Sequence, residues 1–543
     1  MRKPRIHARF KHWRQLIRRL LTGEERIVLT PRYRLVSFRG YGVITTGKIL
    51  RSYRAGIDNM AVVYLVEDEE GYVRYIVEEP EPSEWVRKSY PLIMDHIAYT
   101  APPLERYEDP ENYVRGLVHE AAEELGVADL LGPDIRVLMY YVLRDVVGYG
   151  YIDVPMRDPR IEEIGATGPG QPVQVVHKDV GWLTWLDTNI VIESEDEMAR
   201  FVQRLAQKTG RYISVAKPML EAPSPEKHRL ALALSEIGGK GSSFVVRKHP
   251  AEPYPVTRLV EWGTISSLEA AYLWLLLENY SSLFIVGVMA TGKTTLLNVA
   301  LSMVRPDWHI CTVEDTPELK LPHPGWHPLY TRTGLGLGGG SLDIGLFDLT
   351  KLTLRLRCQV ISVSEVRGEE AKVLIQAAAT GHSSACTFHA GSIAETITRL
   401  TAPPLSIGPS YIRVLSAIAI MQRLHYRGKA VRRLRWIYEI LPEPANGFPY
   451  VEVKAFGVQD RIEYVKVFEW SPEDDQHLPD SAEELAKRSK RLSWLAQATG
   501  RSIDDIIIEL GERQRFIDAL VGERVGDWRE VFARMKRFYA QRR

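Results

Sequence analysis

Cysteine is scarce in this chain, which has three in 543 residues. Cys311, Cys358 and Cys386 are widely separated and form no C-x-x-C pair, which argues against a disulfide framework and against a cysteine-based zinc site. We therefore expect a reducing, cytoplasmic setting and no structural metal. The chain also lacks any apolar run approaching the roughly 18 residues of a membrane-spanning helix, so we expect it not to cross a membrane by itself.

Net charge is nearly absent as well. Lysine and arginine number 70, and aspartate and glutamate 69, which leaves a formal charge of +1. This balance gives no overall reason to expect a nucleic-acid partner, and a surface for such a partner would have to be local. The length and a hydrophobic content of 45% instead predict a multidomain globular protein with about three or four packed domains.

Residues 1–21 are the exception to this balance. They carry eight lysines and arginines and no acid, while apolar residues recur at the spacing of one helical face. The apolar positions are Ile6, Phe10, Trp13, Ile17 and Leu20. The pattern predicts a basic amphipathic helix, which either contacts a membrane surface or an acidic partner, or docks on its own domain.

Composition and periodicity divide the chain into four expected parts. Residues 1–100 hold the basic segment and a strand-rich stretch, and residues 101–252 combine helical periodicity with short strands around a loop-rich span at 216–228. Residues 256–475 follow a proline-rich linker and alternate between helical and strand patterns, which predicts an α/β core with a largely parallel sheet. Residues 476–543 form a helical, charged extension.

The most specific motif lies in the α/β core. Residues 287–294 read GVMATGKT, which fits G-x-x-x-x-G-K-[ST], and an apolar strand pattern precedes them. Glycines let backbone N–H groups converge on phosphates, and the N-terminus of the following helix adds positive charge. We expect Lys293 to reach the β- and γ-phosphates and the Thr294 hydroxyl to bind Mg²⁺. The expected nucleotide contacts are Gly287, Ala290, Thr291, Gly292, Lys293, Thr294 and Thr295.

Acidic and histidine side chains follow three further apolar runs of this core. Glu314 and Asp315 follow the first run, Glu365 the second and His389 the third. Ligands of doubly wound sheets lie outside the carboxyl ends of the strands, so these residues are candidates for a shared site. Transfer of a phosphoryl group to water needs carboxylates for the metal and for the attacking water, and cations for the developing charge. The sequence offers all of these groups.

The motifs resemble those of the secretion and pilus-assembly ATPases of the type II and type IV secretion superfamily, especially its archaeal branch, which powers type IV pili and the archaellum. Residues 287–294 resemble its Walker A motif, 314–323 its Asp box, 365–371 its Walker B motif and 379–390 its His box. Segments between residues 148 and 248 are similar to the second N-terminal domain of the family.

The resemblance implies an α/β fold with a RecA-like P-loop ATPase core, a separate α+β N-terminal domain, an additional N-terminal module and a helical C-terminal extension. It implies ATP and Mg²⁺ as cofactors and a homohexameric ring at the cytoplasmic side of a membrane. The expected partner is a polytopic membrane platform protein, and no direct contact with nucleic acid is expected. Such a motor powers assembly or retraction of a type IV pilus-like filament, or secretion.

The resemblance also implies roles for individual residues. Glu314 would polarise the attacking water, Glu365 would support the metal with Thr294, and His389 would sense the γ-phosphate. An alternative assignment makes Glu365 the base and places Asp315 near the metal.

Two pairs of arginines belong to the same family pattern. Arg229 and Arg247 occupy places that resemble the nucleotide-contacting arginines of the N-terminal domain. Arg355 and Arg357, expected in the helix before the Walker B strand, form a second set that would act across a subunit boundary. An ordinary surface salt bridge is the competing interpretation for each of the four.

Other functions stay open from the sequence. Rings with the same type of core also move nucleic acids, so a translocase, a helicase or a DNA-transfer secretion ATPase is one alternative. A scaffold that binds ATP without hydrolysing it is another, and the full set of acids argues against it. The glycine-rich loop at residues 334–340 fits a surface loop as well as a ligand clamp.

Overall fold

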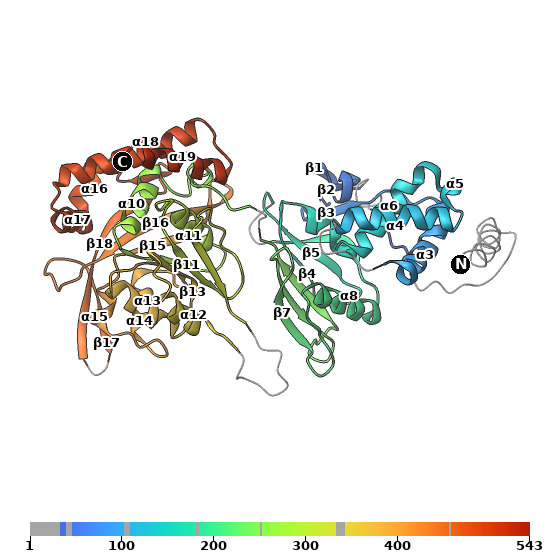
Figure 1. The fold of residues 1–543 in the computed structure, drawn as a ribbon, viewed down its shortest axis with the longest axis horizontal. Coiled ribbons are helices and arrows are strands. Elements are labelled where there is room, and N and C mark those ends of the chain that lie inside the picture. Colours follow the sequence, from blue (N-terminus) through green and yellow to red (C-terminus); the bar gives the residue numbers. More distant parts are fainter. Residues whose placement is uncertain are drawn as a thin grey trace, which may run out of the picture. The chain divides into compact units, whose positions relative to one another are not determined.

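The computed structural model describes residues 33–39, 46–102, 109–180, 184–249, 252–332, 343–455 and 458–542. The chain forms two compact units, residues 1–249 and 250–543 (Figure 1). The basic segment at residues 1–21 and the glycine-rich loop at 334–340 lie outside the described residues. The finer division at residues 100, 252 and 475 stays a prediction.

The first unit is built on one sheet. Its described residues form nine strands in the order β1-β2-β3-β6-β5-β4-β9-β8-β7. The strands are β1 (Lys48–Ala55), β2 (Ala61–Glu67), β3 (Val73–Glu78), β4 (Ile161–Ala166), β5 (Pro172–His177), β6 (Trp185–Val191), β7 (Met219–Pro223), β8 (Arg229–Ala233) and β9 (Ser243–Arg247). Strand β7 falls in the span expected to be loop. It is an edge strand, where a terminal proline such as Pro223 is tolerated.

Helix α8 covers one face of this sheet at β8 and β9. Leu230 and Leu232 on β8 are buried in the same core as Phe201 of α8, while Arg229 and Arg247 lie on the other face, which is less buried. The helices are α3 (Glu84–Thr100), α4 (Pro110–Glu124), α5 (Ala128–Leu131), α6 (Ile135–Val146), α7 (Asp153–Arg157) and α8 (Glu195–Lys208), with short 3-10 turns at Ile57–Asn59, Gly132–Asp134 and Gly150–Ile152.

The second unit contains the predicted α/β core. In its described part, strands β12, β11, β13, β14, β10 and β15 lie side by side and parallel, and β16, β18 and β17 continue the sheet antiparallel. The bounds are β10 (Ser282–Val286), β11 (Ile310–Glu314), β12 (Trp326–Tyr330), β13 (Val360–Val366), β14 (Ser383–Phe388), β15 (Ala417–Tyr426), β16 (Lys429–Ile440), β17 (Tyr450–Ala455), β18 (Val458–Ser471) and β19 (Gln476–Leu478).

Helices cover both faces of the parallel strands, which confirms the expected RecA-like α/β class. Leu283 and Ile285 of β10 join a core with α10, α11 and the C-terminal helices, whereas Phe284 and Val286 join a core with α13 and α14. The helices are α9 (Val256–Glu261), α10 (Ser267–Glu278), α11 (Lys293–Ser302), α12 (Leu346–Thr353), α13 (Glu370–Ala379), α14 (Ile393–Thr401), α15 (Pro409–Ile412), α16 (Ala482–Arg488), α17 (Lys490–Thr499), α18 (Ile503–Gly522) and α19 (Trp528–Ala540).

The charged C-terminal helices pack onto the core through buried ion pairs. Arg513 of α18 is 3% exposed, and its guanidinium contacts Glu278 of α10 at 2.7 Å and Glu509 at 2.6 Å. The same guanidinium lies over the ring of Trp274 at 4.4 Å. Of the helices that the structure describes, none is long and apolar enough to span a membrane.

One expectation about the cysteines is wrong. Cys311 and Cys358 form a disulfide, with their Cα atoms 5.9 Å apart. Strands β11 and β13 are adjacent, and Cys311 pairs in register with Ile361, so residues 47 positions apart in sequence meet. Distance along the sequence therefore does not show how far apart two cysteines lie in the folded protein. Cys386 is free and buried.

Candidate active site

The phosphate-binding loop has the backbone that its sequence predicts. It connects buried strand β10 to α11, and two of its residues take left-handed conformations, Ala290 with φ 59° and Gly292 with φ 91°. A Cβ atom on Gly287 would lie 2.6 Å from the Met421 carbonyl oxygen of the neighbouring strand. Only glycine fits at position 287, because neither backbone segment can move away.

Polar side chains of the loop turn toward its concave side. The Lys293 ammonium donates to the Val288 carbonyl at 2.9 Å, and the Thr291 hydroxyl donates to the same oxygen at 2.9 Å. Thr294 and Thr295 stand partly exposed in the first turn of α11, where the N-terminus of the helix favours anions. These residues fit a triphosphate. The Thr294 hydroxyl is an oxygen donor of the kind that Mg²⁺ prefers.

Glu314 ends strand β11 and is fully buried. Its Oε2 accepts hydrogen bonds from the backbone N–H groups of Glu318 at 2.8 Å and Leu319 at 2.9 Å. The next residue, Asp315, is exposed. Tyr330 pairs in register with Glu314, and burial together with this carboxylate raises the pKa of Tyr330 to about 12.

Glu365 and His389 form a second polar cluster, at the ends of β13 and β14. The Nε2 atom of His389 lies 2.9 Å from Oε1 of Glu365, and Arg367 donates to Oε2 at 2.5 Å. Burial raises the pKa of Glu365. Arg367, His389 and Lys293 together lower it by a larger amount, so its pKa lies below the ordinary value. Burial and the charge of Lys293 lower the pKa of His389. Both groups are therefore within electrostatic reach of the phosphate-loop lysine.

Strand order explains how these residues meet. The parallel neighbours β11, β13, β14 and β10 end at one edge of the sheet, so Glu314, Glu365, His389 and the phosphate loop line the same edge. The site combines two carboxylates, an ammonium group, an imidazole and a cluster of backbone N–H groups. Carboxylates, an ammonium group and backbone N–H groups are the kinds of group that hydrolysis of a phosphoanhydride uses.

The four predicted arginines have different settings. Arg229 and Arg247 are cross-strand neighbours in the first unit; Arg229 forms an ion pair with Glu221, and Arg247 lies 3.8 Å from Glu163.

The second pair of arginines belongs to the α/β core of the second unit. Arg355 and Arg357 are exposed, and they were wrongly expected within a helix. Helix α12 ends at Thr353, and the two arginines lie in the turn that follows, where Arg357 has φ 53°. The apolar periodicity continues past the end of the helix because Leu354 and Leu356 pack on the core from this turn.

Arg432 is a site residue that the sequence analysis missed. Its Nε donates to the carbonyl of Ala290 in the phosphate loop at 3.1 Å, and its Cδ lies 3.4 Å from where a Cβ of Gly292 would stand. Strands β15 and β16 run on past the end of β10 as a two-stranded ribbon. The sequence pattern that could have pointed to Arg432 is the charge of residues 421–435, which hold six lysines and arginines and no acid. Only strand pairing places this ribbon beside the loop.

Comparison with known proteins gives a consistent picture. Residues 187–432 match the model of the family described as type II/IV secretion system protein. The chain is 35% identical over 493 residues to uncharacterized protein MJ0900 of Methanocaldococcus jannaschii, covering 86% of this chain and 85% of that protein. It is 26% identical over 269 residues to the type IV secretion system protein VirB11 of Bartonella henselae, covering 42% and 73%.

Among solved structures, the chain is similar to the pilus retraction motor PilT with bound ADP, at a TM-score of 0.37 and 19% identity, covering 52% of this chain and 80% of that one. The family match spans the phosphate loop, Glu314, Glu365 and His389, and the similarity to MJ0900 extends over most of the chain. This protein belongs to the type II/IV secretion system ATPase family.

Proposed function

We propose that this protein binds ATP at the phosphate loop and hydrolyses it to ADP and phosphate. The observation that supports this most strongly is the placement of Glu314, Glu365 and His389 at the same sheet edge as Lys293. A nucleotide-binding scaffold needs the loop alone. Two buried or half-buried carboxylates and a histidine beside it add groups that hydrolysis uses.

Glu314 is the proposed base. Its carboxylate is dehydrated by burial and held by two backbone N–H groups, so its direction is fixed without reorganisation during the reaction. The attacking water forms the new P–O bond to the γ-phosphorus and passes a proton to this carboxylate, while the bond to the β-phosphate oxygen breaks and ADP leaves. Mg²⁺, held by Thr294 and Glu365, would offset the charge of the β- and γ-phosphates.

The alternative assignment, with Glu365 as the base, has weaker support. The Glu365 carboxylate is engaged by Arg367 and His389, and its pKa is lowered, which reduces its basicity. Asp315 is exposed, which suits a surface turn better than a metal ligand. His389 contacts Glu365 directly, so a histidine that binds the γ-phosphate would also influence the proposed metal ligand.

The arginines are proposed to complete the site from outside. Arg229 and Arg247 lie directly opposite each other on neighbouring strands, and the carboxylates of Glu221 and Glu163 offset part of their charge. A bound phosphate would add a further anion beside this pair. Arg355 and Arg357, exposed in the turn before β13, are proposed to reach the nucleotide of a neighbouring subunit. Hydrolysis would then depend on closure of the first unit and on assembly.

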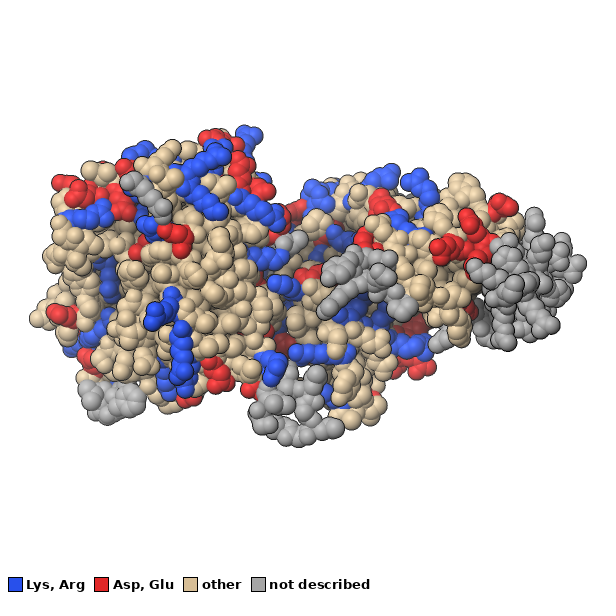
Figure 2. Space-filling view, in the orientation of Figure 1, with Lys and Arg blue, Asp and Glu red and all other residues tan. Residues whose placement is uncertain are grey.

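On this basis we propose a homohexameric motor, peripherally associated with the cytoplasmic face of a membrane. It would drive a polytopic platform protein in filament assembly or retraction, or in secretion, with residues 1–21 as a candidate membrane contact. The family match and the relatives named for secretion and pilus retraction support this function. On the face shown in Figure 2, basic and acidic side chains are interspersed, which gives a nucleic-acid translocase less support.

The proposal is tested by ATPase measurements on the full chain and on Glu314→Gln. We expect Glu314→Gln to bind ATP but to hydrolyse it at least about a hundredfold more slowly. Hydrolysis at the parent rate would refute the assignment of the base. Stimulation by membranes that contain the platform protein supports a secretion motor, whereas strong stimulation by single-stranded DNA alone would favour the translocase.

A further inference from the structure

The position of the Glu314 carboxylate depends on the loop that follows β11. Its Oε2 is held by the N–H groups of Glu318 and Leu319, so a shift of these two residues would turn the carboxylate. Residues 318–323 carry no regular secondary structure, and their position must therefore come from contacts with other elements. Those contacts set the direction of the Glu314 carboxylate.

The loop is attached to the phosphate-loop helix at two points. The Lys320 N–H donates to Oδ1 of Asn298 on α11 at 2.8 Å. His323 is 4% exposed, and its Nε2 lies 3.0 Å from the carbonyl of Val304, just beyond the end of α11. Burial lowers the pKa of His323 to about 4, so at neutral pH the ring is uncharged and Nε2–H can donate this hydrogen bond.

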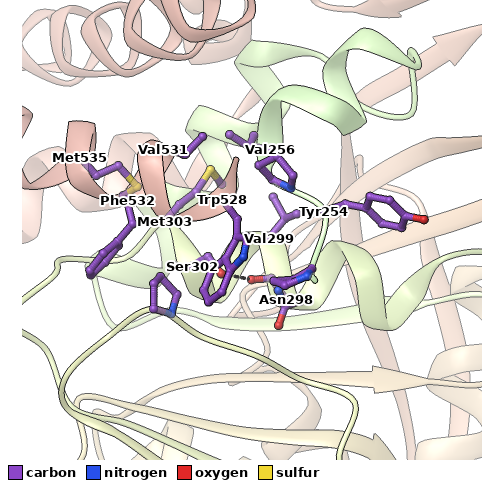
Figure 3. A pocket seen from close by; sticks show the side chains of 13 residues that line it. Tyr254, Val256, Asn298, Val299, Ser302, Met303, Trp528, Val531, Phe532 and Met535 are labelled. Carbon is purple, nitrogen blue, oxygen red and sulfur yellow. Dashed lines mark hydrogen bonds between the residues drawn. The ribbon is translucent and has the colours of Figure 1, made fainter. Parts of the chain in front are cut away.

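C-terminal helix α19 contacts the His323 ring as well. The ring of Phe532, which is buried, meets the His323 ring edge-on at a centroid distance of 4.8 Å. Figure 3 shows a cavity between two helices. Phe532, Val531 and Met535 of α19 line one side of it and face the side chains of α11. The cavity measures about 20 Å³, room for a water molecule and far too small for a nucleotide. Its walls therefore act as a packing interface.

Helix α19 is itself held in place on the core. The Thr257 hydroxyl of α9 donates to the Val525 carbonyl, just before α19, at 2.6 Å in a buried setting. Arg529 forms an ion pair with Glu252 at 2.7 Å. The helix thus rests on the first residues of the second unit on one side and on the loop after β11 on the other.

We propose that α19 is a positioning element for Glu314, in which Phe532 acts through His323 to keep residues 318–323 against α11. Phe532 does not touch the nucleotide, so it is a positioning residue. The inference rests on the proposed role of Glu314 as the base. Removing the Phe532 ring lets His323 and the loop relax toward α19, and the carboxylate loses its fixed direction, which lowers the rate of the chemical step without weakening nucleotide binding.

The test compares kcat and nucleotide affinity in the full-length protein. We expect Phe532→Ala to lower kcat about tenfold, while the Kd values for ATP and ADP stay within about twofold of the parent. Phe532→Met refills the space with a flexible apolar side chain and is expected to restore most of kcat. A loss of kcat that Phe532→Met does not recover would contradict the inference.

Leu485→Ala is the matched control for a purely structural effect. Leu485 lies on α16 and is fully buried in the core shared by the C-terminal helices, so its removal lowers stability in the same extension at a residue outside α19. We expect Leu485→Ala to lower the melting temperature and keep kcat. Equal losses of kcat in both alanine variants, measured where both are folded, would overturn the proposal.

Two further variants keep the result interpretable. If Phe532→Ala does not fold, Asn298→Ala removes the other attachment of the loop and is expected to lower kcat in the same way; parental kcat in this variant would refute the inference. Glu314→Gln is measured in parallel. Parental hydrolysis in Glu314→Gln refutes the proposed base, whereas an inactive Glu314→Gln with a fully active Phe532→Ala refutes the positioning role alone.

Discussion

The imidazole Nε2 of His389 lies 2.9 Å from Oε1 of Glu365, on the adjacent parallel strand. The contact joins two residues that come from different motifs and are expected to do different work, one at the γ-phosphate and one at the metal. Lys293 influences the pKa of both groups, so the pair belongs to the phosphate site. If His389 contacts the γ-phosphate as proposed, a change there would reach the proposed metal ligand Glu365 directly.

His389→Asn is expected to lower kcat about a hundredfold, the usual range for loss of one preorganised donor. Affinity for ADP should change little, because the proposed contact of His389 is with the γ-phosphate, which ADP lacks. Single-turnover hydrolysis and equilibrium binding measure the two quantities. A variant with normal kcat and weak ADP binding would place His389 elsewhere.

Arg432→Gln is expected to weaken binding of ATP and ADP alike, by roughly tenfold, as expected for loss of one charge-assisted contact. The reason is the hydrogen bond from Arg432 to the Ala290 carbonyl, which we expect to support the loop whether ATP or ADP is bound. Arg427→Gln, at the tip of the same ribbon, is the control, since Arg427 bonds the Glu473 carbonyl. Fluorescent-nucleotide titration should separate the two variants, and equal affinities would contradict the prediction.

His477 predicts a pH dependence of stability. Burial lowers its pKa, but Glu269, 2.9 Å from Nδ1, and the Gly263 carbonyl raise it more, so the pKa in the folded state lies above the ordinary value. The protonated His477 therefore stabilises the folded state. This contribution is fully present below about pH 6.5, the pKa of an unfolded histidine, and is lost as pH rises through the folded-state pKa. Melting temperature should fall with rising pH across that window, and less so in His477→Gln.

A melting temperature that depends equally on pH in His477→Gln and the parent would show that other groups dominate this window. The charge of Arg433 opposes protonation of His477, so the shift is a balance of opposing neighbours. Added salt should change the pKa shift of His477 little, because the Glu269 carboxylate is fully buried.

Arg513→Met is expected to lower the free energy of unfolding of the second unit by about 3–5 kcal/mol, because it leaves buried Glu278 without its cation. Arg515→Gln, exposed on the same helix, should cost within about 0.5 kcal/mol. Urea unfolding followed by tryptophan fluorescence reports both, since Trp274 stacks under the Arg513 guanidinium. Equal stability of the two variants would contradict a structural role for the cluster.

Much of the ATPase core could be predicted from the sequence. The phosphate loop, strands β10, β11, β13 and β14 and the candidates Glu314, Glu365 and His389 follow from patterns within short windows. Such windows carry the period of a strand or helix and the chemistry of a loop. Local patterns also predicted a helix at Arg355 and Arg357, beyond the actual end of α12. The apolar spacing continues there although the backbone is no longer helical.

The strand, the glycine-bearing loop and the helix at residues 282–302 follow from local sequence, since each part needs only its neighbours along the chain. Tertiary structure alone decided that Cys311 bonds Cys358, that Arg432 meets Ala290 across 142 positions, and that Phe532 lies on His323. Strand order and helix packing set these distances. Both arise from burying apolar surface over the whole unit, which no local window contains.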